Sequence, residues 1–289
     1  MSSSRSITLT HAENIHKMRE VQTDIPEEPG VEVLIAEMDG CMVPIVETAA
    51  AVDNSEKIDR RKSRKVEWKE ARLCLAHPQG SMTPVYGAII GTPEQAGDQL
   101  LHCAIQAGLG TDTKVHGLGD GAPWIADQIS LQFGLRATYT VDFCHVCDYM
   151  SAAGTVCAGQ DKQSWFDDQK NKLRASRINE LLEMLEPHLE SETVKRGDAP
   201  VRTCYQYIAN RPGQFDYKRA LDAGLPIGSG EVESGHRHVI QERLKLCGAW
   251  WKTENAQYML SLRTLRANGD WQEYGIVRSD KTGQPYSHF

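Results

Sequence analysis

Short apolar runs in the first third of the chain predict three β-strands. Residues 31–36 are apolar on both alternating faces, as in a strand buried in the middle of a sheet, and they lead to Asp39. Residues 67–77 place an apolar side chain at every second position near their end, and residues 85–90 are rich in strand-forming residues between a proline and a glycine. Together these segments predict an antiparallel meander.

A helix and a β-α-β unit are predicted next. Thr92 supplies an N-cap, Pro93 a first-turn proline and Gln95 a capping-box glutamine, and Gly108 ends the apolar periodicity that follows. Two further strands are predicted at 114–119 and 137–143, on either side of a helix at 123–133. The predicted order is therefore βββαβαβ.

The second half of the chain has helical spacing. Leucines and aromatic residues between 161 and 200 predict a helical insertion. The Gly228-Ser229-Gly230 sequence opens a long predicted helix that carries Glu233 and continues to Leu244, and another helix is predicted at about 254–268. The polar first 30 residues, with a short helix near 12–21, are interpreted as a tail or linker remnant.

Composition narrows the class of protein. The 289 residues are 40% hydrophobic and 25% charged, which is typical of a globular protein. No run approaches the roughly 20 apolar residues of a membrane span, and no secretory signal is present, so no membrane partner and a cytoplasmic, nucleoid-associated location are expected. The 8 scattered cysteines favour a reducing compartment. A net charge of -7 requires that local basic clusters carry any DNA binding.

Three acids occupy positions in this order of elements where catalytic carboxylates are expected. Asp39 follows the first strand, Asp120 follows the fourth within Gly-Asp-Gly, and Glu233 lies in the first turns of the late helix. Three carboxylates could hold two Mg²⁺ or Mn²⁺ ions for in-line phosphoryl displacement. Each acid also has a structural interpretation. Aspartates beside glycine often start turns, which would explain Asp39 and Asp120. A glutamate in the first turns of a helix stabilises the helix dipole, which would explain Glu233 and Glu231 equally well.

A family resemblance strengthens the catalytic interpretation. From about residue 31 to residue 274 the chain resembles the ISKra-type insertion-sequence transposases, relatives of the Mutator class of DDE transposases with a ribonuclease-H-like core. The resemblance rests on Met38-Asp39-Gly40, Glu67-Trp68-Lys69-Glu70, Gly119-Asp120-Gly121-Ala122-Pro123-Trp124-Ile125, Asp142-Phe143-Cys144-His145 and Gly224-Leu225-Pro226-Ile227-Gly228-Ser229-Gly230-Glu231-Val232-Glu233-Ser234. It continues through Arg243-Leu244-Lys245, Gly248-Ala249-Trp250, Asn255-Ala256-Gln257 and Leu262-Arg263.

The resemblance implies a fold and a set of roles. It implies an α/β, ribonuclease-H-like fold with a five-stranded mixed sheet, interrupted by an α-helical insertion before the last catalytic helix. It assigns the metal-binding glutamate to the Val-Glu-Ser step, and therefore to Glu233 rather than Glu231. It matches Asp142 and His145 to an Asp-x-x-His element, which gives His145 a supporting catalytic role. Family members carry a long N-terminal region, so DNA recognition is expected to be missing here.

The implied domain plan follows the chain. We expect a tail at 1–30, the first part of the catalytic core at 31–157, the helical insertion at 158–215, the helical end of the core at 216–275 and a tail at 276–289.

Two basic clusters are candidates for binding DNA. The first lies between the first two strands, where a solvated hairpin tip is the alternative, and comprises Arg60, Arg61, Lys62 and Arg64. The second follows Glu233 on adjoining turns, where an ordinary charged helix surface is the alternative, and comprises Arg237, Arg243 and Lys245 with His236 and His238. Three tryptophans suggest base stacking or, preferably, core packing: Trp250, Trp251 and Trp271.

A zinc site is a further candidate. Cys144 and Cys147 have a zinc-ligand spacing and Cys157 lies nearby, but no second matching pair follows. We therefore prefer free thiols.

The sequence thus predicts a DDE transposase that cleaves transposon ends and transfers them to target DNA, as a homo-oligomer assembled on that DNA. Two alternatives stay open. One is a truncated, non-catalytic DNA-binding remnant that modulates a full-length transposase, and the other is a ribonuclease-H-like nuclease.

Overall fold

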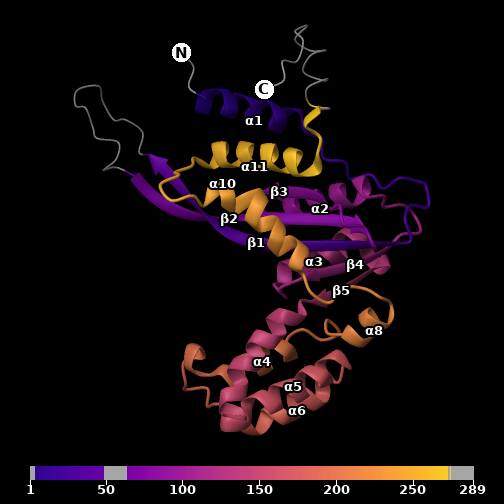
Figure 1. Ribbon diagram of the computed structural model, residues 1–289, viewed down its shortest axis with the longest axis vertical. Helices are drawn as coiled ribbons and strands as arrows, with labels where there is room; N and C mark the ends of the chain where they lie inside the picture. The colour runs from indigo at the N-terminus through magenta and orange to yellow at the C-terminus, as the bar shows by residue number, and fades with distance from the viewer. Residues whose placement is uncertain (1–3, 49–63, 273, 275–289) are drawn as a thin grey trace. The chain divides into compact units, whose positions relative to one another are not determined.

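The computed structural model describes residues 4–48, 64–272 and 274 (Figure 1). The chain divides into two compact units, a first unit of Met1–Thr113 with Gly230–Phe289 and a second unit of Lys114–Ser229. The first change of unit along the chain falls directly before the fourth strand. No helix among the described residues has the length and apolar character that crossing a membrane requires.

The first unit is built on an antiparallel meander, as predicted. It consists of β1 (Val33–Thr48), β2 (Arg64–Pro78) and β3 (Val85–Ile89), with β2 paired to both neighbours. β1 extends well beyond the predicted end near residue 36, so Asp39 lies in the strand interior and not at its end. Pro44 lies in this extended part. Its missing N–H belongs to the edge of β1 that faces away from β2, because the Val46 N–H on that same edge donates to Trp251 O. The β1–β2 hydrogen bonds therefore lose nothing at Pro44.

Helices cover both faces of this meander. On one face, α2 (Pro93–Gln106) begins with the predicted capping box, in which Thr92 and Gln95 exchange backbone and side-chain hydrogen bonds. Gly87 lets α2 approach closely, since a Cβ atom there would lie 2.9 Å from Cys103 Sγ. On the other face pack α9 (Gly230–Gly235), the π-helical segment η5 (His236–Gln241), α10 (Glu242–Leu244) and α11 (Thr253–Asn268).

This second face buries an apolar core of the first unit. Its members come from all three strands and from the late helices: Val43, Ile45, Leu73, Leu75, Tyr86, Val239, Ile240, Leu244, Met259 and Leu260. The late helix was predicted as one regular α-helix, but its middle winds as a π-helix. Such segments are rare and frequently occur at functional sites.

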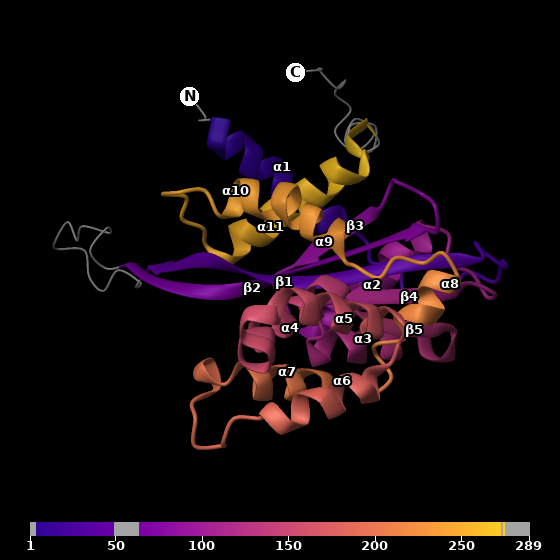
Figure 2. The ribbon, with the colours of Figure 1, turned by 60° about the horizontal axis from the view of Figure 1, so that its bottom comes forward.

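The N-terminal segment contains an ordered helix, α1 (Ser4–Met18), which lies alongside α11 in Figures 1 and 2. Ala12 and Ile15 are buried, and His16 Nδ1 lies 2.8 Å from Ser261 Oγ of α11. The expected tail or linker remnant is thus a packed helix over this range. The residues of the expected C-terminal tail, 276–289, lie outside the described part.

The second unit begins with the predicted β-α-β unit. β4 (Lys114–Gly119) and β5 (Ala137–Val141) pair in parallel, and the predicted helix between them is α3 (Pro123–Phe133), which Gly134 ends. Gly117 and Gly119 let α3 pack tightly on β4, because a Cβ atom on either would lie 2.9 Å from an isoleucine of α3.

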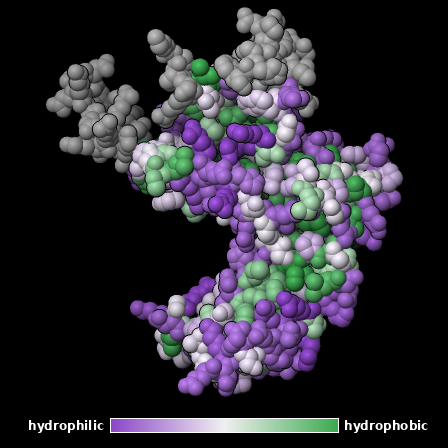
Figure 3. Space-filling view, in the orientation of Figure 1, coloured by the Kyte–Doolittle hydropathy of each residue, from purple (hydrophilic) through white to green (hydrophobic). Residues whose placement is uncertain are grey.

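Helices fill the rest of the second unit, as the spacing predicted. They are α4 (Phe143–Ala158), α5 (Lys162–Arg174), α6 (Ile178–Leu185), α7 (Pro200–Ala209) and α8 (Tyr217–Asp222), with short 3-10 turns η2 (Gly159–Asp161), η3 (Glu186–His188) and η4 (Arg196–Asp198). Figure 2 shows α4 to α7 grouped together, and their apolar faces form one core. Polar residues cover the side of α5 and α6 that is visible in Figure 3.

The fold is α/β, and the five strands form a mixed sheet in the order β3-β2-β1-β4-β5. This topology confirms the predicted class and strand number and is compatible with a ribonuclease-H-like fold.

Candidate active site

Asp39 lies on the face of β1 that receives the late helices. Side chains alternate along a strand, so Glu37 and Asp39 share this face, and their partners on β2 are Leu75 and Leu73. Glu37 is buried, whereas the Asp39 side chain keeps 29% of its surface exposed. One oxygen of Asp39, Oδ1, accepts a hydrogen bond from its neighbour Gly40 N at 2.7 Å. A partly exposed carboxylate thus lies on a sheet face whose other side chains here are the buried Glu37, Leu73 and Leu75.

Three polar contacts attach the late helix to this face. The Val232 N–H donates to Glu37 Oε2 at 2.8 Å, and His236 Nε2 lies 3.0 Å from Asp39 Oδ2. In the same first turn as Val232, Glu231 Oε2 lies 2.9 Å from Nε2 of the buried His77 on β2. The helix therefore follows β1 with Val232 beside Glu37 and, one turn later, His236 beside Asp39.

His236 was expected on a DNA-facing helix surface, but it is 3% exposed and belongs to the Asp39 site. Burial by itself lowers the pKa of His236, and the adjacent Asp39 carboxylate and the Cys41 sulfur outweigh burial and raise that pKa to about 9. The imidazole is therefore protonated at neutral pH and neutralises the Asp39 charge. Sequence reasoning missed this role, although the spacing of His236, three residues after Glu233, was a visible signal.

Glu233 lies in α9 between these contacts. Its side chain is exposed and makes no hydrogen bond or ion pair with any described residue. Glu231, the neighbouring candidate, is instead held by His77. The two acids of the first unit that were predicted to bind metal, Asp39 and Glu233, thus belong to one strand-helix pair.

Asp120 follows β4 directly, as predicted, and lies in the second unit. Its Oδ1 accepts a hydrogen bond from Ala122 N at 2.7 Å, and its backbone carbonyl accepts one from the Tyr207 hydroxyl of α7. Gly121 has φ +85°, a conformation that favours glycine. The Gly121 N–H donates to the Tyr139 hydroxyl at 3.2 Å, and its carbonyl accepts from Arg211 Nε at 2.7 Å. The backbone of the Asp120-Gly121 step is therefore held by Tyr207 of α7, Tyr139 of β5 and Arg211, and no sequence motif predicted these contacts.

Asp142 and His145 were matched to an Asp-x-x-His element, in which His145 was predicted to support catalysis. Asp142 is buried at the end of β5, where it caps α4: its Oδ1 accepts from His145 N at 2.9 Å. Its Oδ2 accepts from both the backbone N–H and the hydroxyl of Ser229, the latter at 2.8 Å. The His145 ring is half-buried and makes no hydrogen bond or ion pair with a described residue. The hydrogen bonds of Asp142 connect Ser229 to the start of α4, and the catalytic role of His145 stays a prediction.

Of the two predicted DNA-binding clusters, the second lies wholly among the described residues and the first almost wholly outside them. Arg60, Arg61 and Lys62 lie outside the described residues, and Arg64 is described only as the first residue of β2, opposite Thr48. In the second cluster Arg237 and Lys245 are exposed, and the Arg243 guanidinium carbon lies 5.4 Å from the centre of the Trp251 ring. His238 stacks edge-on against Tyr86.

The three tryptophans differ in burial. Core packing is confirmed for Trp251, which is 8% exposed, but it is wrong for Trp250 at 43% and Trp271 at 40%.

Cys144, Cys147 and Cys157 are free thiols on α4. Cys157 follows Cys147 by ten residues, or roughly 15 Å along a helix, so it cannot share a zinc ion with the Cys144–Cys147 pair. Burial also raises the pKa of Cys147 to about 11, which disfavours the thiolate that zinc needs.

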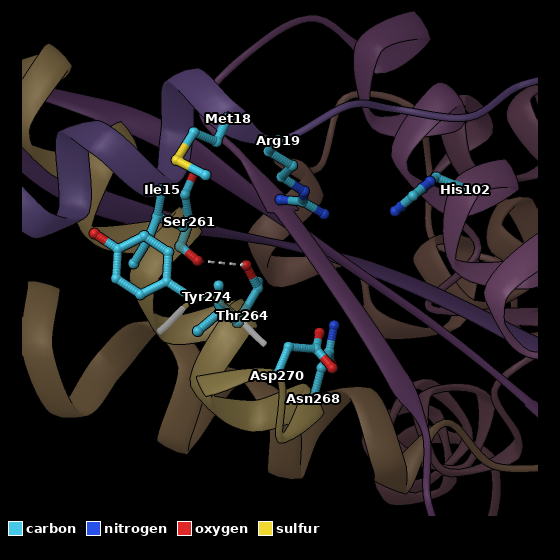
Figure 4. Close-up of a pocket in the computed structure, with 10 residues that line it drawn as sticks. Ile15, Met18, Arg19, His102, Ser261, Thr264, Asn268, Asp270 and Tyr274 are labelled. Carbon is cyan, nitrogen blue, oxygen red and sulfur yellow. Dashed lines mark hydrogen bonds between the residues drawn. The ribbon is translucent and has the colours of Figure 1, made fainter. Parts of the chain in front are cut away.

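A separate pocket of about 260 Å³ lies in the first unit (Figure 4). Residues of α1 and α11, including Ile15 and Thr264, line it together with Arg19 and with His102 of α2. None of the predicted site residues lines this pocket. The pKa of His102 is lowered, mainly by burial and also by Arg19, so its ring is neutral at pH 7 and accepts the Gln22 N–H.

In the part of the chain that the structure describes, no three His, Cys, Asp or Glu side chains converge as a metal site. Comparisons with protein-family models and with curated protein sequences found no match.

Proposed function

We propose that this protein is a DDE-type transposase of the ISKra kind, which cleaves DNA at transposon ends and transfers those ends to target DNA. The observation that carries the proposal is the attachment of the Glu233 helix to the strand that bears Asp39. His236 contacts Asp39 at 3.0 Å and follows Glu233 by three residues. Residues spaced by three on a helix have Cβ atoms about 5–6 Å apart. Glu233 is thereby held within one helical turn of the group that touches Asp39.

Asp39 and Glu233 are better explained as ligands of a cation than as contributors to the stability of the fold. Asp39 keeps an exposed edge inside a sheet face, although an apolar side chain would pack there at no desolvation cost. Glu233 has no described partner, and its neighbour Glu231 already supplies a negative charge to the start of the helix. Glu233 therefore has no structural partner among the described residues, and its effect on the helix dipole duplicates that of Glu231, which favours a functional role for Glu233.

Asp120 supplies the third carboxylate. It follows the carboxyl end of β4, where α/β sheets commonly form their sites, and Tyr207 and Arg211 donate to the backbone carbonyls of Asp120 and Gly121. A rigid support of this kind is expected for a ligand that must be positioned to within a fraction of an ångström. The proposal requires that Asp120 joins Asp39 and Glu233 in the active protein.

These three acids would hold two Mg²⁺ or Mn²⁺ ions. Their oxygen donors suit hard divalent cations. Bound metal would activate the attacking oxygen and stabilise the leaving oxygen of an in-line displacement. The chain's own contribution is to orient the carboxylates: His236 orients Asp39, the tie from Val232 to Glu37 orients the Glu233 turn, and Tyr207 with Arg211 orients Asp120.

The partners in this proposal are transposon-end DNA and target DNA, bound by a homo-oligomer in the cytoplasm at the nucleoid. The exposed Arg237 and Lys245, which follow Glu233 on the same helical stretch, would contact the phosphates of DNA held at the acids. In this proposal α5 to α7 belong to the helical insertion expected at 158–215 of a ribonuclease-H-like core.

The test is Mn²⁺-dependent nicking and strand transfer with a supercoiled plasmid that carries the gene and its flanking DNA. Asp120→Asn should lower product at least about 100-fold, because an amide cannot replace a metal-binding carboxylate. Asp161→Asn is the matched control in the same unit, since Asp161 is exposed and caps no helix with its side chain. Equal product from wild type and Asp120→Asn would refute the proposal. Nicking without transfer would indicate a nuclease, and DNA binding without nicking a regulatory remnant.

A further inference from the structure

A polar pocket of about 430 Å³ lies within the second unit, next to the loop that carries Asp120. Its volume falls in the range of roughly 300–1,000 Å³ that is usual for ligand pockets. Gly121 and the start of α3 form one wall, α7 and the residues after it form another, and Arg196 of η4 completes it. Gly121, Tyr207 and Arg211 line this pocket and also form the contacts that hold the Asp120 loop in place.

Arg211 is fixed in this pocket. Its Nε donates to Gly121 O at 2.7 Å, its Nη1 donates to Tyr207 O at 2.6 Å, and its guanidinium carbon stacks 3.9 Å from the centre of the Tyr207 ring. Tyr207 is itself buried and stacked on Tyr149 at 4.1 Å. A guanidinium has five N–H donors, so three remain for a ligand after these two bonds. Because stacking holds its plane, little side-chain entropy is left to lose on binding.

The remaining walls supply a second cation and several amides. Arg196 is exposed, and its side chain makes no hydrogen bond or ion pair with a described residue. Gln206, Asn210 and Gln214 add neutral donors. Asp127 of α3 is the one acid in the lining, so the charged groups sum to one positive charge. Forked guanidinium donors with amide donors around them match the oxygens of a phosphate group.

We propose that this pocket binds a backbone phosphate of the DNA strand on which Asp120 acts, with Arg196 and Arg211 as its donors. The assignment of DNA as the source of that phosphate rests on the proposed function, whereas the phosphate chemistry rests on the pocket alone. Arg211 links the two sites, because the side chain that receives the phosphate also holds the carbonyl of Gly121. Binding the strand here places the next part of its backbone toward the Asp120 loop.

The experiment measures the binding of fluorescein-labelled single-stranded and duplex DNA to the full chain by anisotropy, with EDTA present and over roughly 50–200 mM salt. Arg196→Gln should weaken binding about tenfold at the low-salt end and reduce the slope of log K against log salt by about 1. Lys195→Gln is the matched control: Lys195 is the exposed neighbour, loses the same charge and does not line the pocket. Asp127→Asn should tighten binding a few-fold, because it removes the opposing charge.

An unchanged affinity and salt slope in Arg196→Gln would overturn the proposal, as would an equal loss in Lys195→Gln. A second arm titrates inorganic phosphate alone by calorimetry. Binding of phosphate that depends on Arg196, without any effect of Arg196 on DNA, would also overturn it and would identify a site for free phosphate. Since no metal is present, these results do not depend on cleavage. If the protein binds DNA through Arg196 but never nicks DNA, the proposed function would be refuted, whereas the assignment of the pocket as a phosphate site would be supported.

Discussion

The Nε2 atom of His236 lies 3.0 Å from the Oδ2 atom of Asp39, and this contact joins the late helix to the central part of β1. It pairs a buried imidazole with a partly exposed carboxylate. The contact thus balances charge at the candidate site and also fixes the position of the helix that carries Glu233.

This contact predicts a pH dependence of stability. The pKa of His236 is about 9 in the folded protein, against 6.5 for an ordinary histidine. Because the folded pKa is the higher one, the stabilisation is fully present below about pH 6.5 and is lost as pH rises through about 9. At most about 3 kcal/mol is involved. Urea unfolding at pH 6, 8 and 10 should show this loss in the wild type.

His236→Gln should be less stable than the wild type at pH 6 and should lack most of the fall between pH 6 and pH 10. The control is His188→Gln, which changes an exposed histidine of η3. Parallel pH profiles for the wild type and His236→Gln would contradict the assignment.

A second prediction concerns the close approach of the late helix to the sheet. A Cβ atom on Gly235 would lie 2.9 Å from Leu73 Cδ2 and 2.9 Å from Tyr86 Cε1, so alanine there must push the helix outward. Gly235→Ala should lower the free energy of unfolding by about 1–3 kcal/mol, the usual cost of overpacking. It should also weaken the contact between His236 and Asp39, which would flatten the pH profile described above.

Gly230→Ala is the matched control in the same helix, because a Cβ atom at Gly230 has no neighbour within 4 Å. Equal unfolding free energies for the two variants would show that the helix has room to move.

These contacts indicate how far the sequence could predict the site. The order of elements along the chain, the capping box at Thr92 and the positions of β4 and α3 followed from local patterns, because turn residues and hydrophobic periodicity act over a few residues. The length of β1 did not. Gly40 and Pro44 weaken a strand in isolation, but the pairing of β1 with β2 and the bond from Val46 N to Trp251 O carry the strand past both. Those partners are distant in sequence.

The same limit applies to the candidate site. The sequence indicated Asp39, Asp120 and Glu233 as individual acids, but not which neighbours hold them. A period of 3.6 residues describes a regular α-helix and so cannot predict the π-helical segment after Gly235. Nor does any pattern connect Tyr207 or Arg211 with a loop nearly 90 residues away. Such long-range polar contacts depend on the packed structure.

A third prediction separates the structural role of Asp142 from catalysis. Its carboxylate accepts hydrogen bonds from His145 N and from the Ser229 backbone and hydroxyl, and it is 1% exposed. An amide in its place would put a donor against at least one of these donors. Asp142→Asn should therefore cost about 1–3 kcal/mol of unfolding free energy.

Calorimetric melting should show this cost, and Asp148→Asn, an exposed position on the same helix, should melt like the wild type. A stable Asp142→Asn protein that lost only DNA cleavage would instead support a catalytic Asp142.

The last prediction decides between the two neighbouring glutamates of α9. Glu231 pairs with the buried His77 at 2.9 Å, whereas Glu233 is exposed and has no described partner. The Glu231 side chain is 37% exposed, so solvent screens the pair, and Glu231→Gln should cost less than about 1 kcal/mol of stability and keep most DNA nicking. Glu233→Gln should leave the unfolding free energy unchanged and lower Mn²⁺-dependent nicking at least about 100-fold, because it removes a metal-binding oxygen without removing a structural contact. Nicking assays and urea unfolding on the same preparations measure both effects. The reverse pattern, with Glu231→Gln inactive and Glu233→Gln active, would move the third carboxylate to Glu231 and make the His77 pair part of the active site.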